Sequence, residues 1–595
     1  MYRTIIFTLV TLFFISCKNE TAKNQEEHSN ETSQLFAGLL DEYYEEGLKL
    51  NPISATMAGD NRYNDKLPNV LSEEHIAKVK EHYQTFKDRA NTFADNGLSD
   101  SERMSKAILN WECDINLAYF DFKKDLMPID QMWSPHLFIG QLASGKSAQP
   151  FKTVQDYDNW LKRLDGYMAW LRSAQENMKL GITTGHVLPK PLIIKVLPQL
   201  QAGMIEDLDK HLFYTPVKNM PKGFSEEDKD RLTEAYTNKI KEELIPAYKD
   251  LHDFMAGEYM AAGRDSSGID DTPNGEELYD YMIKLFTTTN MTADEIHQLG
   301  LSEVARISSE MEKVKAQVGF TGTLKEFFDH VRNNEELMPY EDPQQVIDNF
   351  NAIHERMKPQ INKLFDMKPK TPFEVRRTEA FREKSASAEY NPGSIDGTRP
   401  GIFYTPIPDV TKYNVHQDET LFLHEAIPGH HYQISLTQEN EDLPKFRKTL
   451  WYSGYGEGWA LYTESLGKEL GLYTDPYQYF GTLAAEMHRA IRLVVDTGLH
   501  SKGWTREQAI QYSLENESES EESITREIER YMAMPGQALS YKIGQLKIRE
   551  LREKAEKELG DKFDIAQYHN QVLETGCVPL ALLEDKINAW IEASK

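Results

Sequence analysis

Cysteine is scarce in this sequence, with only Cys17, Cys113 and Cys577 among 595 residues. So few cysteines exclude a small scaffold held together by disulfide bonds. Cys113 and Cys577 could pair in an oxidising compartment, but nothing in the sequence requires that bond. The composition is globular, with 40% hydrophobic residues, and a chain of this length can bury a large core.

Positive charge is also in short supply. The chain has 67 Lys and Arg residues against 95 Asp and Glu residues, which gives a formal net charge of -28. Binding to a nucleic-acid backbone calls for a basic stripe, so we expect no nucleic-acid partner. The acidic balance favours solubility and says little about the fold.

Long apolar runs are missing as well. Residues 5–15 are mostly apolar and follow Arg3, but this run is shorter than the roughly 20 residues of a membrane-spanning helix. The four residues Phe14 to Cys17 resemble a bacterial lipobox, in which the chain is cleaved before a cysteine that then carries lipid. Leu is commoner than Phe at the first of these positions, so an ordinary signal peptide is the alternative.

The N-terminus therefore predicts a lipoprotein signal peptide over residues 1–16. Residues 17–34 would comprise the lipidated Cys17 and a flexible polar tether, rich in Asn, Glu, Thr, Ser and Lys. We expect a protein of the bacterial cell envelope, anchored to the outer membrane, with the periplasmic and the surface face both left open. Contact with the membrane would be through the lipid alone.

Apolar residues recur at helical spacing through most of the remaining chain. The predicted helices cover residues 35–50, 73–93, 100–122, 156–178, 226–260, 292–318, 344–367, 418–436, 456–471, 479–500, 505–514 and 524–559. A loop over residues 263–275, rich in Gly, Ser and Pro, separates an N-terminal helical half (35–270) from a C-terminal helical half (271–595). Residues 371–408 carry β-branched and aromatic clusters between Pro and Gly, which predicts a small antiparallel β element. The fold class is mainly α.

The most informative segment runs from Leu421 to Gln433 and reads LFLHEAIPGHHYQ. A His-Glu pair on an apolar helix is typical of zinc hydrolases, in which a second histidine four residues later shares the metal and the glutamate activates water. Here the fourth residue after His424 is Pro428, which cannot bind metal. The usual spacing is therefore interrupted.

Two arrangements would restore a metal site. Pro428 should kink the helix and Gly429 allows an unusual backbone, so a local bulge would bring His430 to the place that the second histidine normally fills. Alternatively, His431 shares a face with His424, but in an unbroken helix it lies about 10 Å farther along the axis. One zinc ion, with Zn–N distances near roughly 2.1 Å, would strain to reach both. We favour His430.

A third ligand is expected from the next predicted helix. Glu457 stands near its start between Gly456 and Gly458, and an antiparallel helix pair would bring it beside the histidines. Glu464 lies on the same face and could orient a ligand histidine. Each residue also has a structural alternative, since His-Glu pairs and adjacent histidines occur as surface or capping groups. Their combination favours the metal site.

The same residues carry a resemblance to a known family, the domain of unknown function 885 family, often found as bacterial lipoproteins. The matching segments are 424–433 (HEAIPGHHYQ), 456–462 (GEGWALY), 492–500 (RLVVDTGLH), 535–544 (PGQALSYKIG) and, more weakly, 396–401 (DGTRPG). The family is regarded as zincin-like and resembles helical metallopeptidases such as carboxypeptidase Taq, the oligopeptidases and dipeptidyl peptidase III. The resemblance implies a large helical zincin-like metallopeptidase fold and supplies no substrate.

Further residues receive roles as hypotheses. Asp496 could orient His500, which would then donate to a developing oxyanion, and Tyr541 could do the same through its hydroxyl. Arg399 could hold a substrate carboxylate in a two-pronged contact. The alternatives are an Arg-Asp-His ladder between helices, a core tyrosine and a surface ion pair, respectively. Trp459, Phe403 and Tyr404 are expected to be packing residues.

The sequence thus predicts a zinc-dependent hydrolase, a metallopeptidase acting on small peptides in the cell envelope. Zn²⁺ would be held by His424, His430 and Glu457, and Glu425 would accept the proton of the attacking water. The rivals are an amide or ester hydrolase with the same site, and a non-catalytic envelope lipoprotein that binds a nutrient or a partner. The oligomeric state and the cleavage specificity stay open.

Overall fold

The computed structural model describes residues 30–379, 383, 386–394 and 399–595. The predicted signal peptide and Cys17 lie outside this part of the chain. A helix over residues 30–50 begins inside the segment that was expected to be a tether. No helix of the described part combines the length and the apolar character that crossing a membrane would require.

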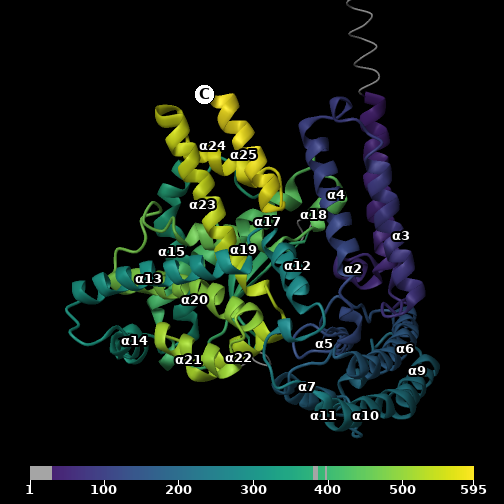
Figure 1. Cartoon of the computed structure of the whole chain (residues 1–595). Helices are drawn as coiled ribbons and strands as arrows, with labels where there is room; N and C mark the ends of the chain where they lie inside the picture. The colour runs from purple at the N-terminus through teal and green to yellow at the C-terminus, as the bar shows by residue number, and fades with distance from the viewer. Residues whose placement is uncertain (1–29, 380–382, 384–385, 395–398) are drawn as a thin grey trace, which may run out of the picture.

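The described residues are mainly helical, as the sequence predicted (Figure 1). The helices before residue 270 are α2 (Pro52–Met57), α3 (Glu73–Ala90), α4 (Asp100–Tyr119), α5 (Pro135–Ala143), α6 (Val154–Thr184), α7 (Lys190–Ala202), α8 (Thr215–Lys218), α9 (Glu226–Asn238), α10 (Ile245–Phe254) and α11 (Met260–Ala262). The π-helical segments η5 (Lys239–Leu244) and η6 (Met255–Tyr259) join the last three.

The later helices are α12 (Gly275–Thr287), α13 (Ala293–Gln317), α14 (Leu324–Asn333), α15 (Pro343–Leu364), α16 (Asp418–Glu425), α17 (His430–Glu439), α18 (Lys445–Thr449), α19 (Ser453–Glu464), α20 (Pro476–Ser501), α21 (Arg506–Asn516), α22 (Glu521–Ala533), α23 (Ser540–Leu559), α24 (Ile565–Leu573) and α25 (Leu580–Ser594). Most of the later helices lie to the left of the earlier ones in the view of Figure 1, with α12 and α18 near its centre. Short 3-10 turns connect several of them.

Two predicted helices are each divided in the structure. The helix expected over 524–559 is α22 followed by α23, because Pro535 cannot donate a backbone hydrogen bond and Gly536 adopts φ +79°. The helix expected over 418–436 is α16 followed by α17, with residues 426–429 forming a turn between them. That second break forms part of the candidate site.

A small sheet lies beside α16 and α17. It consists of β1 (Phe373–Arg377), β2 (Glu389–Asn391) and β3 (Gly401–Thr405), in the order β1-β3-β2. β2 pairs antiparallel with β3, but β1 pairs parallel with β3. The prediction of a purely antiparallel element is therefore wrong for β1. After β1 the chain forms β2 at the opposite edge of the sheet and then returns to form β3 in the middle, parallel to β1.

The apolar core does not divide at residue 270. One cluster joins residues of the first helices, such as Phe36 and Ile115, to residues from Ile269 to Ile591. A separate cluster extends from Ile129 to Tyr259. The helix over 30–50, α3 and α4 therefore share a core with the C-terminal half.

Candidate metal centre

His424 and Glu425 occupy the last turn of α16, and His430 is the first residue of α17. The chain folds back so tightly between them that a Cβ on Gly429 would lie 1.9 Å from the backbone oxygen of His424. Only glycine allows this approach. The predicted bulge within one helix is thus a break between two helices, but its expected consequence holds, since His430 comes to lie beside His424.

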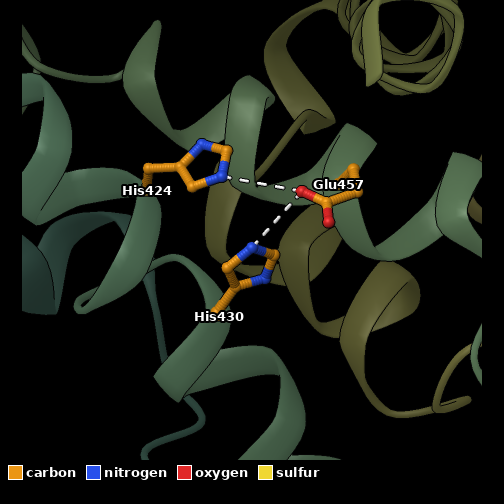
Figure 2. A group of neighbouring side chains, drawn as sticks. All are labelled: His424, His430 and Glu457. Carbon is orange, nitrogen blue, oxygen red and sulfur yellow. Dashed lines mark ion pairs between the residues drawn. The ribbon is translucent and has the colours of Figure 1, made fainter. Parts of the chain in front are cut away.

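The third predicted residue, Glu457 on α19, lies between the two histidines (Figure 2). Its Oε2 is 3.6 Å from His424 Nε2 and 3.4 Å from His430 Nε2. The two imidazole rings have centroids 4.9 Å apart and stand at 89° to each other. One donor atom from each of the three residues lies within 4.8 Å of the others.

The position of α19 depends on glycines that allow close approach to its neighbours. A Cβ on Gly458 would lie 2.5 Å from Gly544 Cα of α23, and one on Gly456 would lie 2.3 Å from the Trp451 ring. The glycines flanking Glu457 therefore make room for α23 and for an indole.

Side chains of α19 also form hydrogen bonds with α16 and with the turn that follows it, residues 426–429. Glu464 Oε1 accepts a 2.7 Å hydrogen bond from His424 Nδ1, which is the contact that the sequence predicted for it. Thr463 Oγ1 donates to Leu423 O at 2.9 Å, and Trp459 Nε1 donates to Pro428 O at 2.9 Å. Trp459 and Phe403 are both fully buried, as expected of packing residues.

The buried charges of the site reinforce one another. Burial opposes the charge on His424, but hydrogen bonds to Glu457 and Glu464 raise its pKa to about 10. Burial likewise opposes the charge of Glu457, but the two histidines hold its pKa well below its usual range. Burial raises the pKa of Glu425, against the lowering effect of the nearby histidines. Glu425 is therefore easier to protonate than an ordinary glutamate.

The donor set suits a divalent cation. Two imidazole nitrogens and one carboxylate oxygen are ligands that zinc accepts, and three protein ligands leave a position open. Glu464 supports the inward orientation of His424 Nε2 by engaging the other ring nitrogen. His430 Nδ1 is buried and finds no hydrogen-bond partner among the described residues, so only one of the two histidines has such support.

His431, the alternative ligand, is not brought into this group. Its Nδ1 lies 2.9 Å from the hydroxyl of Tyr390 on β2, and its ring centroid is 5.0 Å from that of Phe373 on β1. The side chain is only 2% exposed. His431 thus faces the sheet, and its neighbour His430 faces Glu457.

Tyr541, proposed for the oxyanion, lies in the first turn of α23 beside the cluster. Burial, followed by the charge of Glu457, raises its pKa. The guanidinium carbon of Arg492 lies 4.7 Å from the centroid of its ring. Tyr541 is therefore within the electrostatic reach of Glu457.

The expected pairing of Asp496 with His500 is wrong. Asp496 Oδ1 accepts hydrogen bonds from Tyr279 Oη at 2.6 Å and from Gly536 N at 3.0 Å. His500 Nδ1 accepts from Ile269 N at 3.0 Å, and its Nε2 lies 3.0 Å from Tyr531 O. His500 is fully buried with both nitrogens engaged, so it joins backbone segments and has no free proton for an oxyanion.

The remaining predicted residues are not members of the three-residue cluster or lie outside the described residues. Arg399 is exposed on the loop before β3, where its backbone N–H donates to Ser394 Oγ at 2.9 Å. Cys113 and Cys577 are buried free thiols, and Cys17 lies beyond the described part of the chain.

Two residues near the cluster were missed by the sequence analysis. The ring centroid of Trp451, a residue 46% exposed, is 5.8 Å from that of His430. The charge of Arg489 lowers the pKa of Glu425, against the larger effect of burial. In the sequence, Arg489 lies three residues before Arg492 in a predicted helix. This spacing places the two side chains on one helix face and could have pointed to Arg489.

Comparison with known proteins places the chain in a family. The model of the family described as bacterial protein of unknown function (DUF885) matches residues 52–587. The chain belongs to the DUF885 family. No curated protein matches the sequence.

Two solved structures share the fold of this DUF885 protein. One, described as a candidate lipoprotein from Colwellia psychrerythraea, has 29% sequence identity and a TM-score of 0.85, covering 94% of this chain and 99% of its own. The other, a candidate lipoprotein of unknown function from Shewanella oneidensis, has 19% identity and a TM-score of 0.74, covering 92% and 99%. The second shows likeness of fold alone.

Proposed function

We propose that this DUF885 protein is a zinc-dependent hydrolase, a metallopeptidase that acts on small peptides in the cell envelope. The observation that carries the proposal is the convergence of His424, His430 and Glu457 on one point between α16, α17 and α19. Glu464 supports it by fixing the orientation of His424. A bound zinc ion would supply a polarised water and a Lewis acid at this point.

The residues around that point have complementary tasks. Glu425 follows His424 directly and has a raised pKa, which suits a group that takes the proton of water and passes it to the leaving amine. Tyr541, whose pKa is raised from the usual 10, has a hydroxyl that is protonated at neutral pH and would donate to the oxyanion. Water would thus add its oxygen to the acyl carbon while the C–N bond breaks and the amine receives the proton.

Small substrates suit a site this deeply buried, since His424, Glu425 and His430 are each at most 9% exposed. The lipid anchor and the envelope location are proposed from the N-terminal sequence and from the descriptions of both related structures as candidate lipoproteins.

The first test is the zinc content of the protein lacking residues 1–16, with Cys17 replaced by Ser. We expect about one zinc per chain, retained by His431→Ala and lost by His430→Ala and Glu457→Ala. His431→Ala is the matched control, because it removes an adjacent buried histidine that faces the sheet. Glu425→Gln should keep zinc and lose about 10²–10⁴-fold of peptide hydrolysis.

The rival function, a binding lipoprotein without catalysis, makes the opposite prediction. Wild-type protein purified with zinc in the buffer would then contain no stoichiometric metal. That result would overturn the hydrolase proposal. Cleavage of ester substrates and not of a peptide library would instead favour an esterase with the same site.

A further inference from the structure

Arg489 on α20 is an arginine without a carboxylate partner. Among the residues that the structure describes, its buried Nε has no hydrogen-bond partner, and its Nη1 reaches only the backbone oxygen of Ala485 at 3.3 Å. No carboxylate of the described residues lies within ion-pair distance of it. Acidic residues outnumber basic ones by 95 to 67, so an unpaired, partly buried guanidinium is unexpected here.

Arg492 adds a second free donor on the same helix face, three residues further on. Its Nε donates to Tyr531 Oη at 3.0 Å and its Nη2 to Glu527 Oε2 at 2.9 Å. The residue is only 8% exposed. Its Nη1, by contrast, is buried and has no hydrogen-bond partner among the described residues. Buried donors left unpaired cost stability, so two of them on one helix face are suited to an acceptor that the described residues do not supply.

This arginine face borders the candidate metal centre. Arg492 lies over the ring of Tyr541 on α23. α20, which carries both arginines, also packs against α16, where Glu425 stands next to His424. The two arginines therefore belong to a helix that adjoins the groups that would handle water and the leaving amine.

We propose that Arg489, together with Nη1 of Arg492, binds a carboxylate of the substrate, and that this is the free C-terminal carboxylate of a small peptide. The inference rests on the proposed function and names its substrate class. A guanidinium holds a carboxylate through charge-assisted, often paired hydrogen bonds. Such a contact would anchor the peptide by its end and select exopeptidase over endopeptidase action. It replaces Arg399, which lies exposed on a loop, as the residue that recognises the carboxylate.

The test compares two libraries of N-acetylated tetrapeptides, one with free C-terminal carboxylates and one with C-terminal amides, with products identified by mass spectrometry. The zinc-loaded wild type should cleave the acids at least about tenfold faster, in kcat/KM, than the amides. Arg489→Gln should remove this preference mainly by raising KM for the acids, and Arg489→Lys should keep part of it. Arg172→Gln, an exposed arginine on α6, is the matched control and should behave as wild type.

A binding measurement gives a readout independent of turnover. In the Glu425→Gln background, calorimetry should show at least about tenfold tighter binding of an N-acetylated tetrapeptide acid than of its amide, and Arg489→Gln should abolish the difference. Equal cleavage of acids and amides would overturn the inference and leave the proposed hydrolase standing. A preference for Asp or Glu side chains regardless of the C-terminus would also overturn it. No cleavage of either library would overturn the inference, and no cleavage of the same peptides with free N-termini as well would overturn the proposed function itself.

Discussion

Glu464 determines which nitrogen of His424 faces the candidate centre. It accepts a 2.7 Å hydrogen bond from His424 Nδ1, which leaves Nε2 directed toward Glu457. Its side chain is almost completely buried, so no water can easily take its place. Carboxylates in this position orient ligand histidines and increase their basicity.

Replacing Glu464 by Gln should therefore weaken zinc binding without abolishing it. The amide can still accept the hydrogen bond, but it carries no charge. We expect an affinity about 10–100-fold lower, measured by competition with a zinc-binding dye. Glu441→Gln, at an exposed position, should leave the affinity unchanged. Wild-type affinity in Glu464→Gln would show that the contact is merely structural.

His500 should contribute to stability in a pH-dependent way. Burial lowers its pKa from the usual 6.5 to about 3, so the folded protein keeps this ring neutral. Because the folded pKa is below the unfolded value, the stabilisation is present above about pH 6.5 and is lost as the pH falls toward 3. The neutral variant His500→Gln can reproduce both hydrogen bonds and should lose this dependence.

The measurement is the free energy of unfolding in urea from pH 7 to pH 4. His500→Gln should show a slope smaller by about one proton and unchanged peptide hydrolysis at neutral pH. His569, whose pKa burial also lowers to about 3, should account for part of the pH dependence of unfolding that remains in this variant. Loss of catalysis with intact stability would restore His500 to the chemical mechanism.

At the scale of elements, the contact between α19 and α23 sets the distance between Glu457 and Tyr541. Gly458 and Gly544 let the two backbones meet. A Cβ on Gly458 would lie 2.5 Å from Gly544 Cα, and that atom belongs to the backbone and cannot swing away. The same pair of helices presents a candidate metal ligand and the phenol beside it.

Gly458→Ala should force the helices apart. We expect a loss of about 1–3 kcal/mol in the free energy of unfolding, measured in urea, together with reduced hydrolysis. Gly257→Ala is the control, because a Cβ there meets nothing within 4 Å and the residue lies in a helical segment. That change should be neutral or stabilising by about 0.5–1 kcal/mol. Equal effects of both substitutions would contradict the close-contact argument.

At the scale of the whole molecule, the candidate centre joins three helices that pack on one another in a single core cluster. His424 ends α16, His430 begins α17 and Glu457 belongs to α19. α19 packs in turn on α23, and all four helices contribute to the core cluster that includes Phe36 and Ile591. A metal bound at this point would therefore favour the folded state of that whole cluster.

Zinc should accordingly raise the thermal midpoint of the wild type. The expected gain is about 2.7 kcal/mol when free zinc is at 100 times its dissociation constant. Differential scanning calorimetry with and without zinc measures it. Glu457→Ala should show no zinc-dependent shift, and His431→Ala should shift as the wild type does. A shift that survives in Glu457→Ala would indicate binding at another site.

The sequence by itself determined the helical class and pointed to the three central residues. Apolar periodicity is local, and so is the interruption at Pro428, which favoured His430 over His431 but left both open. A proline removes a hydrogen bond whatever its surroundings. The motif around Glu457 could be matched to His424 because neighbouring helices commonly pack antiparallel.

Only the tertiary structure decided which groups pair with each side chain and each strand. Asp496 and His500 share a helix face, yet they bond to Tyr279, Gly536 and backbone groups from other segments. The parallel pairing of β1 with β3 and the unpaired state of Arg489 depend equally on segments distant in sequence. Spacing along one element fixes which way a side chain points, whereas its partner is set by whichever element packs opposite.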